Sequence, residues 1–277
     1  MIYYTYPGFR NKALTISYDD GLWSDVHLLE ICNRYGIRGT FNLNSGCMQE
    51  ERRIGKDRIA ELYKGHEVAT HGVKHLTLAR CPMTDVVKEI LEDRQALEEL
   101  TGEIVCGHAY PNGSYSPEIK TLLPSLGIHY ARTATDTGLY THPQDFYEWN
   151  PTCHHNNRLM YHAKEFLSFD LPQFQYLFYV WGHSYEFDRD NNWDVIEEFC
   201  KMIGGREDIW YATNAEVCHY LMAVKQVHTS VDEKLLFNGS GQDIYLIRNG
   251  ENILLRPGEL QRIHSPESHG KLRKIVL

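Results

Sequence analysis

Short apolar runs alternate with amphipathic stretches along the first 225 residues of the chain. Runs of strand type occur at 13–18, 38–43, 67–70, 104–109, 128–132 and 176–182. Stretches with helical spacing of apolar residues occur at 24–35, 56–64, 84–101, 116–126, 158–169, 193–202 and 214–224, with Ser24 and Thr84 as expected N-caps. Strands that alternate with helices predict parallel βαβ units. The periodicity is compatible with either a barrel or a doubly wound sheet.

The pattern changes near Val227. Short strand-like runs at 234–237, 244–247 and 253–256 are separated by Asn-Gly and other glycine-containing turns, with no helical stretch between them. This pattern predicts a small antiparallel β appendix. The expected organisation is therefore a catalytic α/β domain at 1–226 and the appendix at 227–277.

Composition narrows the class of protein. The 277 residues carry a net charge of −9 and no basic patch, which disfavours a nucleic-acid or anionic-membrane partner. No apolar run reaches the roughly 20 residues of a membrane helix, and the N-terminus lacks the features of a signal peptide, so we expect a cytoplasmic chain without a membrane partner. The seven Cys residues include no C-x-x-C and are expected to be reduced.

Four polar motifs follow predicted strands. They are S-Y-D-D-G (17–21), H-G-V-K-H (71–75), A-Y-P-N-G (109–113) and W-G-H-S (181–184). Each has an ordinary alternative when taken alone: an Asp-rich turn, a solvated His pair, a plain turn, and a hydrogen-bonded core His. The two His residues, four positions apart, can meet one divalent metal if their segment turns helically. Because parallel α/β folds keep their active sites at the carboxyl ends of strands, the four together favour one site.

The motifs supply the groups that metal-assisted hydrolysis needs. Of two adjacent carboxylates, one can bind a cation while the other serves as a base. Two imidazoles and one carboxylate form a ligand set that leaves positions on a divalent metal for water and substrate. A His beyond a buried strand can act as an acid near neutral pH.

Together the motifs resemble those of the polysaccharide deacetylases (NodB homology, carbohydrate esterase family 4). S-Y-D-D-G resembles T-F-D-D-G, H-G-V-K-H resembles H-S/T-x-x-H, A-Y-P-N-G resembles R-x-P-x-G, and W-G-H-S-Y resembles the late L-x-H motif. The resemblance covers about residues 10 to 225. It implies a distorted barrel of about seven β/α units, with the β appendix added at the C-terminus.

The resemblance also implies a metal site. Asp20, His71 and His75 would hold one divalent metal, zinc first, with cobalt, nickel or manganese as alternatives. Asp19 would be the general base. His183 would protonate the leaving group.

The third motif departs from the family pattern. The resemblance implies that the backbone N–H of Tyr110 faces the developing oxyanion. The family's arginine in this motif is replaced by Ala109. We expect Arg132, at the end of the next strand, to supply a guanidinium to Asp19 instead, with a purely structural arginine as the alternative.

Other departures concern aromatic and acidic residues. Tyr18 replaces the usual Phe, and the family's fourth motif has no clean match, with Asp136 and Trp149 as its only candidate remnants. Three further histidines are candidates near the site but outside the ligand set: His108, His154 and His155.

The implied partner is an acetylated oligo- or polysaccharide, and the oligomeric state is left open. The leading hypothesis is removal of N-acetyl groups from a glycan. The alternatives are an O-acetyl esterase acting on a polymer such as xylan, a metal-free amidohydrolase, and a carbohydrate-binding protein with a decayed site.

Overall fold

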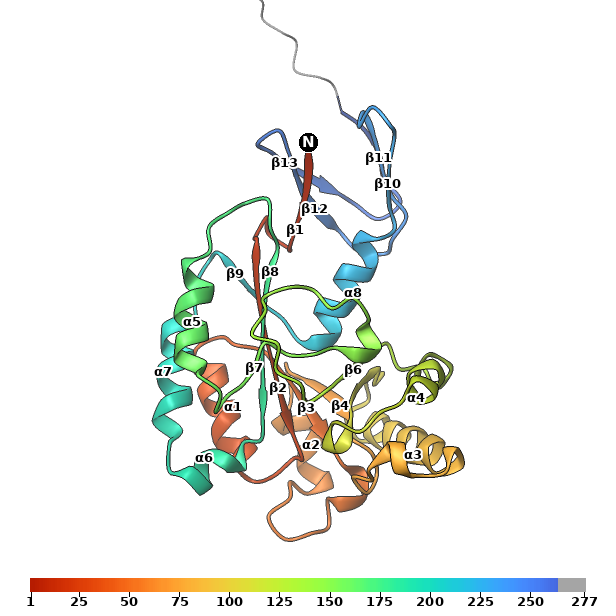
Figure 1. Ribbon diagram of the computed structural model, residues 1–277, viewed down its shortest axis with the longest axis vertical. Coiled ribbons are helices and arrows are strands. Elements are labelled where there is room, and N and C mark those ends of the chain that lie inside the picture. Colours follow the sequence, from red (N-terminus) through yellow and green to blue (C-terminus); the bar gives the residue numbers. More distant parts are fainter. Residues whose placement is uncertain (264–277) are drawn as a thin grey trace, which may run out of the picture.

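The computed structural model describes residues 1–263, and its centre is a curled sheet of parallel strands (Figure 1). The strand order is β6-β5-β4-β3-β2-β8-β7, with β9 beside the first half of β2. The parallel strands are β2 (Lys12–Asp19), β3 (Gly39–Leu43), β4 (Glu67–Thr70), β5 (Gly107–Ala109), β6 (Tyr130–Arg132), β7 (Cys153–His154), β8 (Tyr176–Gly182) and β9 (Ile209–Tyr211).

One backbone bridge links the two ends of the sheet. Trp149 forms a parallel bridge with Arg132 of β6, and the same segment continues into β7, which pairs with β8. The N–H of Trp149 donates to Ala131 O at 3.0 Å. The expected distorted barrel of about seven strands is therefore confirmed, and the strand ends that carry the polar motifs curve around a common centre.

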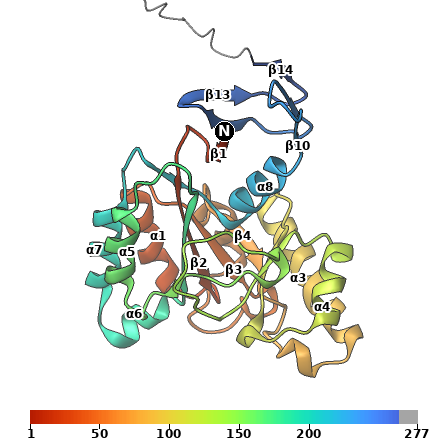
Figure 2. The same ribbon diagram turned by 45° about the horizontal axis from the view of Figure 1, so that its top comes forward.

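Helices cover the outside of the curled sheet because each has one apolar stripe. Helices α1, α5, α6 and α7 lie together on one side, and α3 and α4 lie on the other (Figures 1 and 2). Their bounds are α1 (Ser24–Arg34), α2 (Ile59–Leu62), α3 (Met83–Thr101), α4 (Pro117–Leu122), α5 (Leu159–Ser168), α6 (Tyr185–Asp190), α7 (Trp193–Ile203) and α8 (Asn214–Val224). Every residue of β2 is buried, as expected for a strand covered on both faces.

Helix starts follow local hydrogen bonding, and two of the expected caps are wrong. Ser24 is the first residue of α1, not its cap, and its hydroxyl donates to Asp188. The long helix α3 begins at Met83, directly after Pro82, one residue before the expected cap Thr84. In contrast, Ser116, at the start of the helix expected at 116–126, caps α4 by accepting a hydrogen bond from the N–H of Ile119.

The small β region has two antiparallel sheets. Strands β10 (Val227–Thr229), β11 (Leu235–Asn238) and β14 (Leu260–Arg262) form one sheet. Strands β12 (Ile244–Arg248) and β13 (Glu251–Leu255) form the other together with β1 (Ile2–Thr5), from the start of the chain. The predicted antiparallel appendix is confirmed, while the division at residue 226 stays a prediction. Residues 264–277 of that appendix lie outside the described residues.

The β region lies beyond the amino ends of the barrel strands, on the side away from the end of β2 (Figures 1 and 2). One apolar cluster joins Leu236 and Leu246 of this region to Tyr220 of α8 and Tyr179 of β8. The two parts of the chain therefore share a continuous core. Within residues 1–263, no helix combines the length and the apolar character needed to cross a bilayer.

Candidate active site

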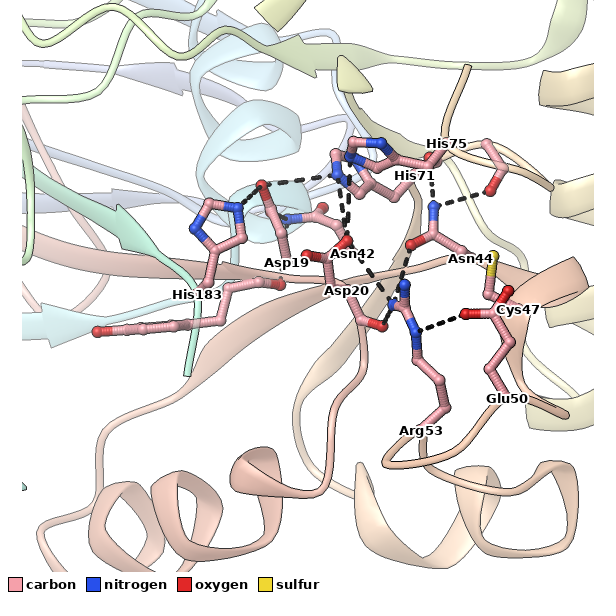
Figure 3. Close-up of polar contacts among 12 residues, drawn as sticks. Asp19, Asp20, Asn42, Asn44, Cys47, Glu50, Arg53, His71, His75 and His183 are labelled. Atoms are coloured by element: carbon pink, nitrogen blue, oxygen red, sulfur yellow. Dashed lines mark hydrogen bonds and ion pairs between the residues drawn. The ribbon is translucent and has the colours of Figure 1, made fainter. Parts of the chain in front are cut away.

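The four polar motifs meet at the carboxyl ends of the barrel strands. They line one cavity of about 310 Å³. All seven site residues expected from the sequence contribute to its wall: Asp19, Asp20, His71, His75, Tyr110, Arg132 and His183. Figure 3 shows Asp19 and Asp20 between His183 on one side and the His71–His75 pair on the other.

Asp20, His71 and His75 form a compact set of metal-ligand side chains. One ligand atom from each lies within 4.8 Å of the others. Asp20 Oδ1 is 3.9 Å from Nε2 of His71 and 3.9 Å from Nε2 of His75. The mixed carboxylate–imidazole donors suit a divalent cation placed between the three side chains, and binding one tetrahedrally would draw the side chains together by about half an ångström.

The backbone that presents these ligands is irregular. Asp20 and His75 have φ of 82° and 57°, a left-handed conformation that non-glycine residues rarely adopt. Residues 71–75 do not turn helically but form an irregular loop after β4, and this loop still brings the two imidazoles together. Such conformations cost about 1–3 kcal/mol each and are concentrated at functional sites. Here they direct both side chains toward the same point.

The tautomer of His71 follows from its surroundings. Its Nδ1 lies 2.8 Å from the carbonyl oxygen of Ala109, which can only accept, so Nδ1 carries the proton. Nε2 is left with its lone pair directed toward Asp20 and His75. Burial lowers the pKa of His71 and keeps the ring neutral, although Asp19 and Asp20 oppose this effect. A neutral imidazole with a fixed second nitrogen is the usual form of a metal-ligating histidine.

Asp19 is a buried, ionised carboxylate. Asn42 Nδ2 donates to its Oδ1 at 2.8 Å, and the guanidinium of Arg132 contacts its Oδ2. Burial alone would raise its pKa, but Arg132, His71 and His183 outweigh this and lower the pKa of Asp19 to about 2. Asp19 is therefore charged at neutral pH and is held in one orientation.

The contact between Arg132 and Asp19 expected from the sequence is present, and two further residues fix the arginine. The guanidinium carbon of Arg132 lies 4.5 Å from the centroid of the Trp181 ring. Trp181 in turn donates from Nε1 to Asp136 Oδ1 at 2.7 Å. Asp136 thus orients the tryptophan on which Arg132 stacks. The catalytic role of Arg132 stays a prediction.

His183 lies on the other side of Asp19 and faces a carboxylate that the sequence analysis missed. Its Nε2 is 3.9 Å from Asp19 Oδ2, and its Nδ1 is 3.7 Å from Glu186 Oε2. Burial alone would lower the pKa of His183, but Glu186, Asp19 and Asp20 raise it above its ordinary value. The ring is therefore set up to carry a proton near neutral pH.

Glu186 also contacts His154 and His155, two of the histidines expected near the site. Its Oε2 lies 3.0 Å from Nε2 of His154 and 3.2 Å from Nε2 of His155. His155 lies against the backbone of β8, where a Cβ on Gly182 would come within 2.0 Å of its Nδ1. A glycine before His183 is therefore required by packing. The only sequence signal for Glu186 is its position three residues after His183, in a helix that was not predicted.

The backbone N–H of Tyr110 does not face the cavity. It donates to the carbonyl oxygen of Arg132 at 3.0 Å and so continues the pairing of β5 with β6. The expectation that this N–H is available to an oxyanion is not supported by this geometry. The Tyr110 hydroxyl donates to Tyr147 O at 2.8 Å. Tyr110 therefore contributes to the wall of the cavity.

Arg53 is a second residue that the sequence analysis missed. Its Nη1 donates to the backbone oxygen of Asp20 and lies 3.7 Å from Oδ1 of the same residue. It also reaches Asn44 Oδ1 at 3.4 Å and pairs with Glu50 at 3.7 Å (Figure 3). This arginine stabilises the unusual backbone of Asp20. No spacing rule connects residue 53 to the Asp-Asp motif.

The remaining candidate residues lie outside the cavity and make contacts within the protein core. His108 is fully buried, its Nδ1 lies 2.7 Å from Thr70 Oγ1, and burial lowers its pKa to about 3. Trp149 is 1% exposed and packs edge-on against Tyr179 at 4.9 Å, so it is a core residue. All seven cysteines are unpaired, and all but Cys81 are buried.

A larger cavity of about 810 Å³ adjoins the candidate site. Tyr185 lines both cavities, and Arg53 lines the larger one. Trp23 lies in its wall with 53% of its surface exposed. The guanidinium of Arg58 lies 5.0 Å from the centroid of the Trp23 ring and covers one face. The larger cavity is an open extension of the site with an aromatic side chain in its wall.

Known proteins are similar to this chain in sequence and in fold. Residues 7–131 match the model of the polysaccharide deacetylase family. A chitooligosaccharide deacetylase from Sinorhizobium fredii is 22% identical over 139 residues, a match that spans 49% of this chain and 63% of that protein.

Two solved structures share the fold at 17% identity. A polysaccharide deacetylase family protein from Mycobacterium smegmatis aligns with a TM-score of 0.61 over 80% of this chain and 93% of its own. The allantoinase Puue aligns with a TM-score of 0.58 over 77% and 91%. The family match runs from before β2 to residue 131 in β6 and therefore covers the Asp-Asp and His-His positions, and it ends one residue before Arg132. On this match, together with the motifs, the first half of the chain is similar to the polysaccharide deacetylase family.

Proposed function

We propose that this protein is a metal-dependent deacetylase that hydrolyses N-acetyl groups on a glycan. The observation that carries this proposal is the arrangement of Asp20, His71 and His75 as one ligand set, with Asp19 and His183 beside it in a single cavity. A decayed carbohydrate-binding protein would have no reason to keep this arrangement. The family match and the chitooligosaccharide deacetylase relative support the same class of reaction.

Asp20, His71 and His75 would hold a divalent metal, which would supply Lewis acidity by polarising the acetyl carbonyl and by lowering the pKa of water from 15.7 to roughly 7. Asp19 accepts the proton that water loses as it attacks the acetyl carbon. A carboxylate with a pKa of about 2 is a weak base, so the lowered pKa of water is essential. Arg132 and Asn42 keep Asp19 ionised and correctly oriented.

His183 completes the reaction as the acid. With its pKa raised, its Nε2 carries a proton that is donated to the leaving nitrogen as the carbon–nitrogen bond breaks. Glu186 holds Nδ1 of the same ring. The proton that His183 donates and later regains is therefore the one on Nε2, on the cavity side. The products are acetate and a free amine. The neighbouring cavity beside Trp23 accommodates further sugar units of the glycan.

The test measures acetate released from N-acetylated chito-oligosaccharides and from acetylated xylan, before and after chelation and after zinc or cobalt is restored. We expect release from the N-acetylated substrate that is lost with chelator and regained with metal. Release from acetylated xylan alone would show that the protein hydrolyses O-acetyl esters instead of N-acetyl groups. If the metal-loaded protein released acetate from neither, the deacetylase proposal would be wrong.

A further inference from the structure

A second cluster of metal-ligand side chains lies at the opposite end of the barrel. Cys106, His129 and His219 each offer one ligand atom, and these atoms lie within 4.8 Å of one another. None of them belongs to the four motifs or to the cavity at the carboxyl end. The sequence separates them by 23 and 90 residues, so only folding brings them together.

The sheet and one helix place the three residues. Cys106 and His129 directly precede β5 and β6, and the N–H of His129 donates to Cys106 O at 2.7 Å. They therefore lie at the amino ends of the same strands whose carboxyl ends lead to Tyr110 and Arg132. His219 comes from α8, which packs across this end and leads into β10 of the antiparallel region.

The distances suit coordination by one ion. Cys106 Sγ is 3.7 Å from His219 Nε2, and His129 Nδ1 is 2.8 Å from the same nitrogen. Tetrahedral zinc with its usual bond lengths sets the sulfur–nitrogen separation at about 3.5 Å and the nitrogen–nitrogen separation at about 3.3 Å. The first distance already agrees. The second requires a shift of about half an ångström in His129, whose side chain is exposed and can move.

We propose that Cys106 Sγ, His129 Nδ1 and His219 Nε2 form a binding site for a zinc-class metal ion, which links helix α8 to the amino ends of β5 and β6. A thiolate with two imidazoles favours such an ion over magnesium or calcium, which prefer oxygen ligands. A fourth position, on the exposed side of His129, is left for water. This inference does not depend on the proposed deacetylase activity.

The surroundings support a structural ion at this site. A cavity of about 180 Å³ is lined by both Cys106 and His219 and provides an entry path. Since α8 continues into the β region, the ion would hold that region against the barrel.

Cobalt titration of the apoprotein tests the proposal, because only a thiolate ligand gives a sulfur-to-cobalt charge-transfer band. We expect wild type to bind two equivalents of Co²⁺, one of them with this band. Cys106→Ser and His219→Ala should lose the band and one equivalent. Asp20→Ala should lose the other equivalent and keep the band, which separates this site from the catalytic one.

Two matched thiol variants control the assignment. Cys218→Ser removes a buried thiol whose Sγ faces His129 O at 3.7 Å, and Cys47→Ser removes a thiol near the candidate active site. Both should keep the band. A wild-type protein without the band, or a band that persists in Cys106→Ser, would overturn the proposal. Zinc should also raise the thermal unfolding midpoint of Asp20→Ala, but not that of a Cys106→Ser, Asp20→Ala double variant.

Discussion

Both ends of the same barrel strands carry metal-ligand side chains, and the surroundings of the Asp20 cluster and the Cys106 cluster differ. At the carboxyl end, Asp20, His71 and His75 are bordered by Asp19 and His183, which can accept and donate protons in an open cavity. At the amino end, Cys106, His129 and His219 form a cluster bordered by α8, with no carboxylate among the three. Ligands alone suffice to bind an ion, whereas catalysis also requires adjacent proton-transfer groups and space for a substrate.

The largest expected difference between the two ends is in turnover. Asp20→Ala removes the carboxylate ligand, and because a catalytic cation contributes several kcal/mol, kcat/KM for acetate release should fall by about a thousandfold or more. His219→Ala, at the other end, should change it far less. Elemental analysis of both variants accompanies the kinetics. Metal and turnover retained together in Asp20→Ala would contradict the ligand assignment.

A buried carboxyl group near the carboxyl ends of the strands, that of Asp25, should make the free energy of unfolding depend on pH. Burial raises the pKa of Asp25 from 3.8 to about 7, although Ser184 and Tyr63 donate hydrogen bonds to it. Between pH 4 and 7 the unfolded chain loses this proton while the folded protein keeps it. The contribution of Asp25 to the free energy of unfolding should therefore fall across this window, by an amount on the order of a few kcal/mol, and level off above pH 7. Buried histidines with a lowered pKa, such as His108, contribute in the opposite direction.

Asp25→Asn should make the slope of the unfolding free energy against pH more positive than in wild type, as measured by urea unfolding at several pH values. Asp93 makes a similar contribution that remains in the variant, because burial raises the pKa of Asp93 to about 7 as well. Asp190→Asn, a change at an exposed residue, should leave the slope unaltered. An Asp25→Asn protein with the full wild-type slope would show that Asp25 is ionised in the folded protein at low pH.

Glu186 should control the acid at the carboxyl end without touching the substrate. Glu186→Gln removes the charge that faces Nδ1 of His183, so kcat should fall about 10–100-fold, as is typical for groups that orient a functional histidine. KM should change little, and the alkaline limb of the pH–rate profile should move to lower pH. Asp190→Asn on the same helix is the control, since its carboxylate pairs with Arg189 alone. A wild-type kcat would refute the role.

The smallest expected effect concerns the cavity beside the carboxyl end. Trp23→Ala removes an exposed aromatic face whose stacking contributes about 1 kcal/mol, so KM should rise about fivefold for long oligosaccharides and less for short ones. Leu260→Ala, an exposed apolar residue in the antiparallel region, is the control at the other end. Equal effects of Trp23→Ala on short and long substrates would argue against an extended binding site.

Local patterns predicted most of the fold and the core of the candidate site. Strands at 67–70 and 176–182 and the helix at 214–224 have the bounds expected from apolar periodicity. The strands β1, β7 and β9, of two to four residues, were missed, because so few residues hold little periodic signal and depend on their neighbours in the sheet. The short helix α6, which carries Glu186, was missed for a related reason: six residues cover less than two turns.

The sequence by itself determined the alternation of strands and helices and the motifs that follow each strand, because both are set by neighbours within a few residues. It therefore identified Asp19, Asp20, His71, His75 and His183. The tertiary structure alone decided which of these groups touch, that Tyr110 turns its N–H into the sheet, and that Glu186 and Arg53 join the site. It alone placed Cys106 beside His219, because contacts between residues more than a hundred positions apart depend on how the whole sheet closes and leave no local trace.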